Sequence, residues 1–396
     1  MKTWRLTNVC PFGGVASTVM ITDGRISAIA PGAVPPDGTP VEDGRGMLLL
    51  PGFVEGHTHL DKTAFHLPDW LVNQVGPRIE DKIDTEREWR ARTGHDAGAA
   101  SLALARAFLA QGTTRIRTHV DVDTSAGTKH VERVLQTREA MAGLQEIQIV
   151  AFPQSGMLAR QGTDALLDAA LAMGADIVGG LDPCAIERDP VRHLDIVFGL
   201  AEKHGKPVDI HLHEPGTMGA FSLDLILERT RALGMEGRVV VSHAFCLGDI
   251  PERDRDALLA RMAALGVAIA TTAPASRLVP LVAPCRAAGV TIFGGNDGIR
   301  DTWTPYGSPD MLERAMLIGL RNNFRRDDEV AVALDCVTGA GATGCGFDAY
   351  GLEAGARADL VLVEARSLAE AVVARPTRRL VVSGGRVVAR DGVLLA

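Results

Sequence analysis

The sequence has few aromatic residues and no excess of basic ones. Phe, Trp and Tyr make up 4% of the 396 residues, which leaves little material for a surface on which nucleic-acid bases could stack. Lys and Arg total 41 against 49 Asp and Glu, so the formal net charge is −8, and no basic run forms a local patch. Both absences argue against a nucleic-acid partner.

Paired cysteines and long apolar segments are also missing. The 6 cysteines are scattered without CxxC spacing, and we expect them to be free thiols in a reducing compartment. No apolar run reaches the length of a membrane-spanning helix, and the first residues, MKTWRLTNVC, lack the apolar segment of a signal peptide. We therefore expect a cytoplasmic protein without a membrane partner.

The chain does have ample apolar material, 46% of its residues, in a regular alternation of short runs with longer amphipathic segments. Many of the longer segments carry apolar residues at i, i+3 and i+4, the pattern of an amphipathic helix. Eight βα units in roughly 250 to 300 residues predict an α/β protein with a (β/α)₈ TIM barrel. A doubly wound open sheet is the alternative, although no GxGxxG follows the first run. The eight apolar runs are 52–56, 114–120, 147–152, 176–180, 208–213, 239–243, 267–271 and 290–295.

Short strands are expected at both ends of the chain. Asp23-Gly24 between two apolar runs predicts a β-hairpin near the N-terminus. We predict a small β-sandwich domain formed from both chain ends, and interpret 65–93 as a loop and helix insertion over the barrel mouth. The expected terminal strands are 15–21, 25–30, 47–50, 358–363, 379–383 and 386–389, and the expected division is 1–50 and 346–396 for the sandwich and 51–345 for the barrel.

Polar residues of metal-binding type follow most of the predicted barrel strands. His57 and His59, two apart at the end of the first strand, share one face of it. An HxH pair alone can be two ordinary histidines in a loop. Barrels, however, place catalytic groups where strands end, and further candidates stand at those positions: His119, Asp121, His211, His213, His243 and Asp297.

With these residues the sequence resembles the amidohydrolase superfamily, and within it the cytosine deaminase group, over nearly the whole chain. HxH with a downstream His and Asp marks only the superfamily, whereas the FPQ and HxxE elements and the D…DxW…PxG run are more specific to the group. The matching segments are FVEGHTHLDKT at 53–63, RTHVDV at 117–122, QIVAFPQSG at 148–156, DIHLHE at 209–214, SHAF at 242–245 and GNDGIRDTWTPYG at 295–307.

The resemblance implies a single divalent metal ion, Zn²⁺ or Fe²⁺, held by three histidines and one aspartate. Such an ion lowers the pKa of a bound water from about 15.7 to about 7, which makes hydroxide available at neutral pH. Spacing alone does not choose between His211 and His213, but the family pattern places the ligand three residues before the glutamate. The implied ligands are His57, His59, His211 and Asp297.

The same resemblance implies roles in proton transfer and substrate binding. Glu214 would exchange a proton with a ring nitrogen, His243 would orient the attacking water, and Asp297 would accept its proton. Two of these residues have an ordinary structural alternative: His243 could be a core histidine and Glu214 a solvated loop acid. The implied substrate-binding residues are Gln154, which could instead cap a turn, Phe152, Trp303 and Arg300.

Two departures from the bacterial cytosine deaminase pattern widen the choice of substrate. Asn296 and Gly298 stand where His and Asp are expected, and Gly298 predicts a larger and less acidic pocket. Residues 179–183 offer no lysine, which argues against a binuclear centre with a carboxylated lysine.

We therefore predict a metal-dependent aminohydrolase that deaminates a small amino-substituted heterocycle, a cytosine-like pyrimidine or related ring, and releases ammonia. The expected partners are this small molecule and further copies of the chain in a homo-oligomer. A cyclic amide hydrolase that uses the same mononuclear site is the alternative. A third interpretation is a relative that binds a ligand without catalysis.

Overall fold

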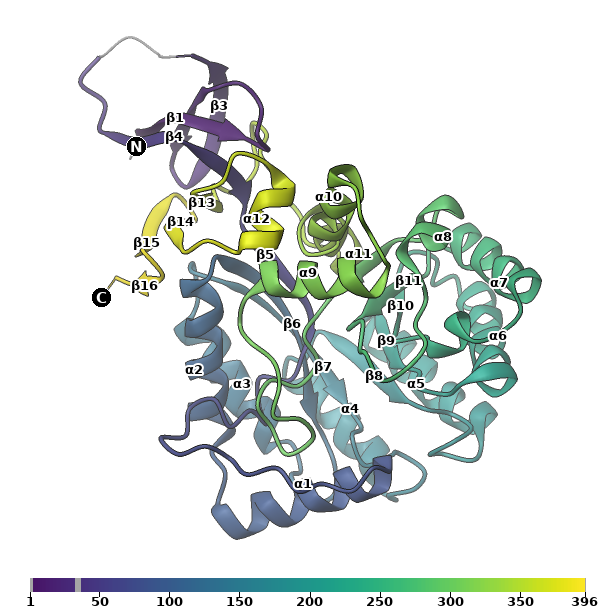
Figure 1. The fold of residues 1–396 in the computed structure, drawn as a ribbon. Helices are drawn as coiled ribbons and strands as arrows, with labels where there is room; N and C mark the ends of the chain where they lie inside the picture. The colour runs from purple at the N-terminus through teal and green to yellow at the C-terminus, as the bar shows by residue number, and fades with distance from the viewer. Residues whose placement is uncertain (1–2, 33–36, 396) are drawn as a thin grey trace.

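The computed structural model describes residues 3–32 and 37–395, whose strands form two sheets (Figure 1). One sheet has eight parallel strands in the order β12-β11-β10-β9-β8-β7-β6-β5. Its two edge strands meet through the parallel bridge between Thr58 and Asp297, so the barrel is nearly closed. These strands are β5 (Phe53–Thr58), β6 (Thr113–Asp121), β7 (Glu146–Phe152), β8 (Ile177–Leu181), β9 (Val208–His211), β10 (Val239–Ser242), β11 (Ala268–Thr271) and β12 (Ile292–Gly294).

Helices follow the barrel strands, which confirms the predicted (β/α)₈ architecture. Each of the eight apolar runs of the sequence contains or overlaps a strand, and every residue of β6 is buried. A parallel sheet covered by helices needs such continuous apolar runs. The helices are α1 (Ile79–Thr93), α2 (Ala97–Ala110), α3 (Lys129–Ala140), α4 (Thr163–Met173), α5 (Pro190–His204), α6 (Gly216–Ala232), the 3₁₀ turn η1 (Phe245–Gly248), α7 (Glu252–Ala264), α8 (Val282–Ala287), α9 (Met311–Arg321), α10 (Asp327–Asp335), α11 (Gly339–Cys345) and α12 (Leu368–Ala374).

The second sheet combines strands from both ends of the chain, as predicted. Its order is β16-β15-β14-β13-β4-β1-β2-β3, and β4 pairs in parallel with β1 and antiparallel with β13. The purple and yellow ribbons of Figure 1 lie together for this reason. Its strands are β1 (Thr3–Pro11), β2 (Ser17–Thr22), β3 (Arg25–Pro31), β4 (Val41–Pro51), β13 (Leu360–Val363), β14 (Arg378–Ser383), β15 (Arg386–Arg390) and β16 (Val393–Leu394).

The hairpin predicted at Asp23-Gly24 joins β2 to β3. Both turn residues have positive φ, 48° for Asp23 and 82° for Gly24, as the right-handed twist of a two-residue hairpin requires. Strand β1 was not predicted, because its apolar residues do not alternate regularly and its register shifts between Leu6 and Val9. The domain limits at 50/51 and 345/346 stay a proposal.

The segment expected as an insertion carries the helix α1. Trp89 and Glu86 of this helix are buried, so one face of α1 packs against the barrel. Over the described part of the chain, the structure contains no helix with the length and apolarity needed to cross a membrane.

Candidate metal and active site

The four predicted metal ligands lie together at the carboxyl ends of the barrel strands. His57 belongs to β5 and His59 directly follows it, His211 ends β9, and Asp297 follows β12. Asp297 Oδ1 is 3.1 Å from His59 Nε2 and 3.8 Å from His57 Nε2. One ligand atom from each of the three histidines lies within 4.8 Å of the others. This spacing of the three histidine nitrogens is close to that of a tetrahedral site, in which nitrogen and oxygen ligands lie about 2.0 to 2.2 Å from the cation.

The ring nitrogens of these histidines are arranged as a cation site requires. His59 Nδ1 lies 3.0 Å from the carbonyl oxygen of His119 and donates to it. In the neutral ring, Nε2 is then unprotonated, and its lone pair is available to a cation. His57 Nε2 and both ring nitrogens of His211 are buried without a hydrogen-bond partner among the described residues. A buried polar nitrogen without a partner lowers the stability of the fold. A divalent cation bound by these nitrogens would supply the missing partner.

The electrostatics of the ring nitrogens agree with that assignment. Burial, followed by the neighbouring imidazoles, lowers the pKa of His57 and of His211 well below the usual value. Burial also lowers the pKa of His243 to about 3, an effect that His213 strengthens. The rings are therefore neutral near pH 7, which is the form of imidazole that binds metal ions.

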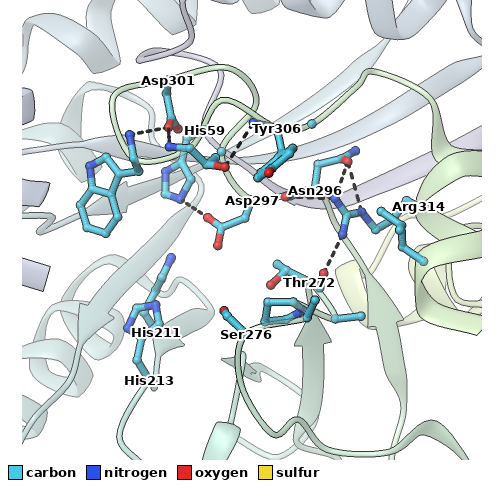
Figure 2. A pocket seen from close by; sticks show the side chains of 18 of the residues that line it. His59, His211, His213, Thr272, Ser276, Asn296, Asp297, Asp301, Tyr306 and Arg314 are labelled. Carbon is cyan, nitrogen blue, oxygen red and sulfur yellow. Dashed lines mark hydrogen bonds and ion pairs between the residues drawn. The ribbon is translucent and has the colours of Figure 1, made fainter. Parts of the chain in front are cut away.

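A cavity of about 790 Å³ opens beside this cluster (Figure 2). Its wall includes His59, His211 and Asp297, so a bound molecule would lie next to the cation site. Three of the four predicted substrate-binding residues also line it, namely Phe152, Gln154 and Trp303.

Each of these three side chains is held in place by a neighbour. The Phe152 ring stacks on His211, with ring centroids 4.0 Å apart and planes 24° apart. The oxygen of the Gln154 amide accepts a hydrogen bond from the Lys62 ammonium, so its NH₂ group remains to donate to a ligand. Trp303 Nε1 donates to Glu86 Oε2 at 2.6 Å, which ties the loop after β12 to α1.

Three predicted catalytic or substrate-binding residues lie outside the cavity lining, namely Glu214, His243 and Arg300. Glu214 is 1% exposed; its Oε1 accepts the backbone N–H groups of Cys184 and Ala185, each at 2.7 Å. Burial raises the pKa of Glu214. The Arg300 guanidinium lies 4.6 Å from the ring centroid of Trp70. His243 is 1% exposed, and its ring lies against that of His213, which does line the cavity.

His213, which the sequence left as an alternative ligand, faces the cavity. Its Nδ1 lies 2.8 Å from Asp182 Oδ2, and its backbone N–H donates to Asp182 Oδ1 at 2.6 Å. Burial opposes a charge on this ring, but Asp182 raises its pKa. The ring of His243 stacks on it at a centroid distance of 4.4 Å. The second histidine of the HLHE segment was a signal for this site, but no pattern connected it with Asp182.

Lys62 is another site residue that the sequence analysis passed over. It lies inside the matched segment FVEGHTHLDKT and is 3% exposed. Its ammonium lies 3.3 Å from Asp121 Oδ1 and 3.6 Å from Glu86 Oε2. Burial disfavours its charge, but these carboxylates raise its pKa, so Lys62 places a positive charge at the cavity wall.

The space beside Gly298 is filled by another side chain of the same loop. A Cβ at this position would lie 2.0 Å from Asp301 Oδ2, so the Asp301 side chain occupies the space that a residue at 298 would need. The other oxygen of Asp301 accepts the N–H groups of Trp303 and Thr304 at 2.8 and 2.9 Å. Asp301 therefore places a carboxyl group in the cavity lining, and the smaller acidity expected from Gly298 itself stays a prediction.

Gly295 fits closely against β5, the strand that contains the predicted metal ligand His57. A Cβ added at 295 would lie 2.4 Å from the backbone nitrogen of His57 and 2.5 Å from its Cβ. We expect Gly295→Ala to lower the free energy of unfolding by about 2 kcal/mol, because the two backbones must separate. Urea unfolding of the chelator-treated protein measures this effect.

The matched control is Gly199→Ala in α5, where an added Cβ would meet nothing within 4 Å. Alanine in a helix interior should stabilise the protein by about 0.5 to 1 kcal/mol. If the two variants unfolded at the same urea concentration, the close approach at Gly295 would not matter for stability.

A parallel barrel whose strand ends gather three histidines and an aspartate is typical of metal-dependent hydrolases. In a comparison with models of protein families, residues 41–389 match the model described as "Amidohydrolase family", and the chain belongs to this family. The predicted family is thus confirmed, and the chain is a metal-dependent amidohydrolase.

Comparisons with individual proteins name particular enzymes of this family. A crystal structure of N-isopropylammelide isopropylaminohydrolase from Burkholderia multivorans ATCC 17616 is 65% identical, with a TM-score of 0.97 over 100% of both chains. N-isopropylammelide isopropyl amidohydrolase of Pseudomonas sp. (strain ADP) is 33% identical over 365 residues, 89% of each chain. The 5-methylcytosine deaminase of Klebsiella pneumoniae, liganded with 5-fluorocytosine, is 27% identical with a TM-score of 0.87, covering 99% of this chain and 98% of the other.

Proposed function

We propose that this amidohydrolase removes the alkylamino group of an N-alkylated, oxygen-substituted triazine such as N-isopropylammelide, and releases the amine. The observation that carries the proposal is the 65% identity with N-isopropylammelide isopropylaminohydrolase over the full length of both chains. It narrows the predicted amino-substituted heterocycle from a cytosine-like ring to a triazine.

Four residues would hold one divalent cation, Zn²⁺ or Fe²⁺, in this proposal: His57, His59, His211 and Asp297. When bound, the cation supplies a Lewis acid and lowers the pKa of water. Asp297 would accept a proton at a carboxylate oxygen, and His243, 1% exposed behind the cavity, would orient the attacking water.

The cavity wall supplies the contacts for the ring. Phe152 and Trp303 would lie against its faces, while the Gln154 NH₂ group would donate to a carbonyl oxygen or ring nitrogen. Lys62 behind Gln154 favours an edge rich in oxygen, because its charge attracts carbonyl dipoles or an anionic ring. These preferences suit an oxygen-substituted triazine.

Proton delivery to the departing amine has two candidates. His213 lines the cavity, and because its Nδ1 is paired with Asp182, its Nε2 is left to meet a substrate. Glu214, which the resemblance favoured, would first have to give up its hydrogen bonds to Cys184 and Ala185. Binding of substrate by Arg300 and assembly into a homo-oligomer stay proposals as well.

Product analysis of a substrate panel tests the function. We expect the metal-loaded protein to release isopropylamine from N-isopropylammelide. The mass of the ring product should show that a hydroxyl group has replaced the alkylamino group. Ammonia release from cytosine or 5-methylcytosine without any isopropylamine would overturn the triazine assignment. A product that has gained one water and lost no amine would favour the alternative, a cyclic amide hydrolase.

A further inference from the structure

Behind the metal ligand His57 lies a buried chain of hydrogen bonds that the sequence did not predict. His57 Nδ1 is 2.9 Å from Ser242 Oγ, and Ser242 Oγ is 2.6 Å from Asp209 Oδ1. All three residues are 0% exposed, so water does not compete for these groups. They belong to the strands β5, β10 and β9, which places the chain of contacts across the barrel interior.

The direction of these hydrogen bonds follows from counting protons. The carboxylate of Asp209 can only accept, so the single proton of the Ser242 hydroxyl is donated to it. Ser242 Oγ must then accept from His57, which requires the proton of the neutral imidazole to be on Nδ1. The lone pair is consequently on Nε2, the nitrogen that has no hydrogen-bond partner and lies 3.8 Å from Asp297.

The negative end of this chain is itself anchored. Arg117 Nη1 lies 3.1 Å from Asp209 Oδ2, which keeps the carboxylate charged in a buried position. Arg117 in turn donates to the carbonyl oxygen of Cys345 at 2.8 Å and to Gln148 Oε1 at 3.0 Å. His119 Nε2 approaches the other oxygen of Asp209 at 3.4 Å. Asp209 therefore cannot easily turn away from Ser242.

We propose that Ser242 and Asp209 are positioning residues that fix the tautomer and orientation of His57 and thereby set the affinity of the site for its cation. The inference rests on the metal site of the proposed function but not on its substrate. Outer partners of a ligating histidine typically contribute 10-fold to 100-fold in metal affinity.

Metal affinity in the absence of substrate tests the proposal. Ser242→Ala should raise the Kd for Zn²⁺, measured by competition with a chromogenic chelator, by about 10-fold to 100-fold. The control is Ser101→Ala, which also removes a 0% exposed hydroxyl, one bonded to Thr137 in the helical layer at 2.7 Å. Ser101→Ala should leave the Kd unchanged. Equal Kd values for the two folded variants would overturn the proposal.

A measurement on the unaltered chain keeps the proposal testable if Ser242→Ala does not fold. In the chelator-treated protein with ¹⁵N-labelled histidine, the His57 resonances, identified by their loss in His57→Gln, should show the proton on Nδ1. A proton on Nε2 would overturn the inference. If the unaltered chain bound no Zn²⁺, the metal site and this inference would both fail, whereas intact binding without amine release would contradict the proposed function alone.

Discussion

Asp297→Asn is expected to lower kcat/KM for amine release by at least about 10³-fold, because asparagine keeps the shape of the side chain but can neither carry the charge nor accept a proton. Asp297 Oδ1 is 3.1 Å from His59 Nε2 and 3.8 Å from His57 Nε2, beside the histidines that we propose hold the cation. The variant should also retain less metal after dialysis. Steady-state kinetics and elemental analysis of the same preparation measure both effects.

Asp256→Asn is the matched control for this substitution. Asp256 is an exposed carboxylate in α7 that pairs with Arg255 at 2.9 Å. The kcat/KM of Asp256→Asn should stay within about twofold of that of the unaltered protein, because Asp256 lies outside the cavity. Its surface ion pair also contributes at most about 1 kcal/mol to stability. If Asp297→Asn kept full activity and full metal content, Asp297 would not be a metal ligand.

Asp359→Asn is expected to lower the free energy of unfolding by about 3 kcal/mol. Asp359 is 2% exposed, precedes β13 of the terminal sheet and lies 2.6 Å from Arg115 Nη1 of the barrel strand β6. Its other oxygen accepts the N–H of Gly384 at 2.8 Å. Removing the charge leaves the buried Arg115 guanidinium at the junction of the two sheets with only the more distant carboxylate of Glu146, 3.5 Å from its Nε. Urea unfolding followed by circular dichroism measures the loss.

The pair between Glu42 and Arg390 provides the comparison. It lies within the terminal sheet, with a contact of 2.8 Å, but the two side chains are 32% and 44% exposed. Glu42→Gln should therefore change the free energy of unfolding by less than about 1 kcal/mol. An equal loss in both variants would show that burial at the junction adds nothing to the Arg115–Asp359 pair.

The sequence predicted the barrel and the ligand cluster because both depend on local pattern. Apolar runs of strand length marked each barrel strand, and His57, His59 and His211 stand at strand ends, which a barrel brings to one face. The turn at Asp23-Gly24 was predicted for the same reason, since its residue types alone determine the backbone.

The residues that the sequence did not reveal act across strands. The roles of Asp182 and Ser242 depend on their contacts with His213 and His57, which belong to other elements. Spacing along the chain does not predict such contacts. The orientation of the Glu214 side chain could not be predicted for the same reason. The backbone N–H groups that bind it, those of Cys184 and Ala185, belong to the loop after another strand. Lys62 stood within a matched segment, yet its importance depends on Gln154 being opposite.

Titration of the chelator-treated protein with Zn²⁺ tests the central claim, that one cation held by His57, His59, His211 and Asp297 drives the reaction. Isopropylamine release from N-isopropylammelide should rise linearly with added Zn²⁺ and reach a plateau at one equivalent per chain. A plateau only at two equivalents would contradict a mononuclear site, and undiminished amine release from protein shown to contain no metal would contradict metal dependence itself.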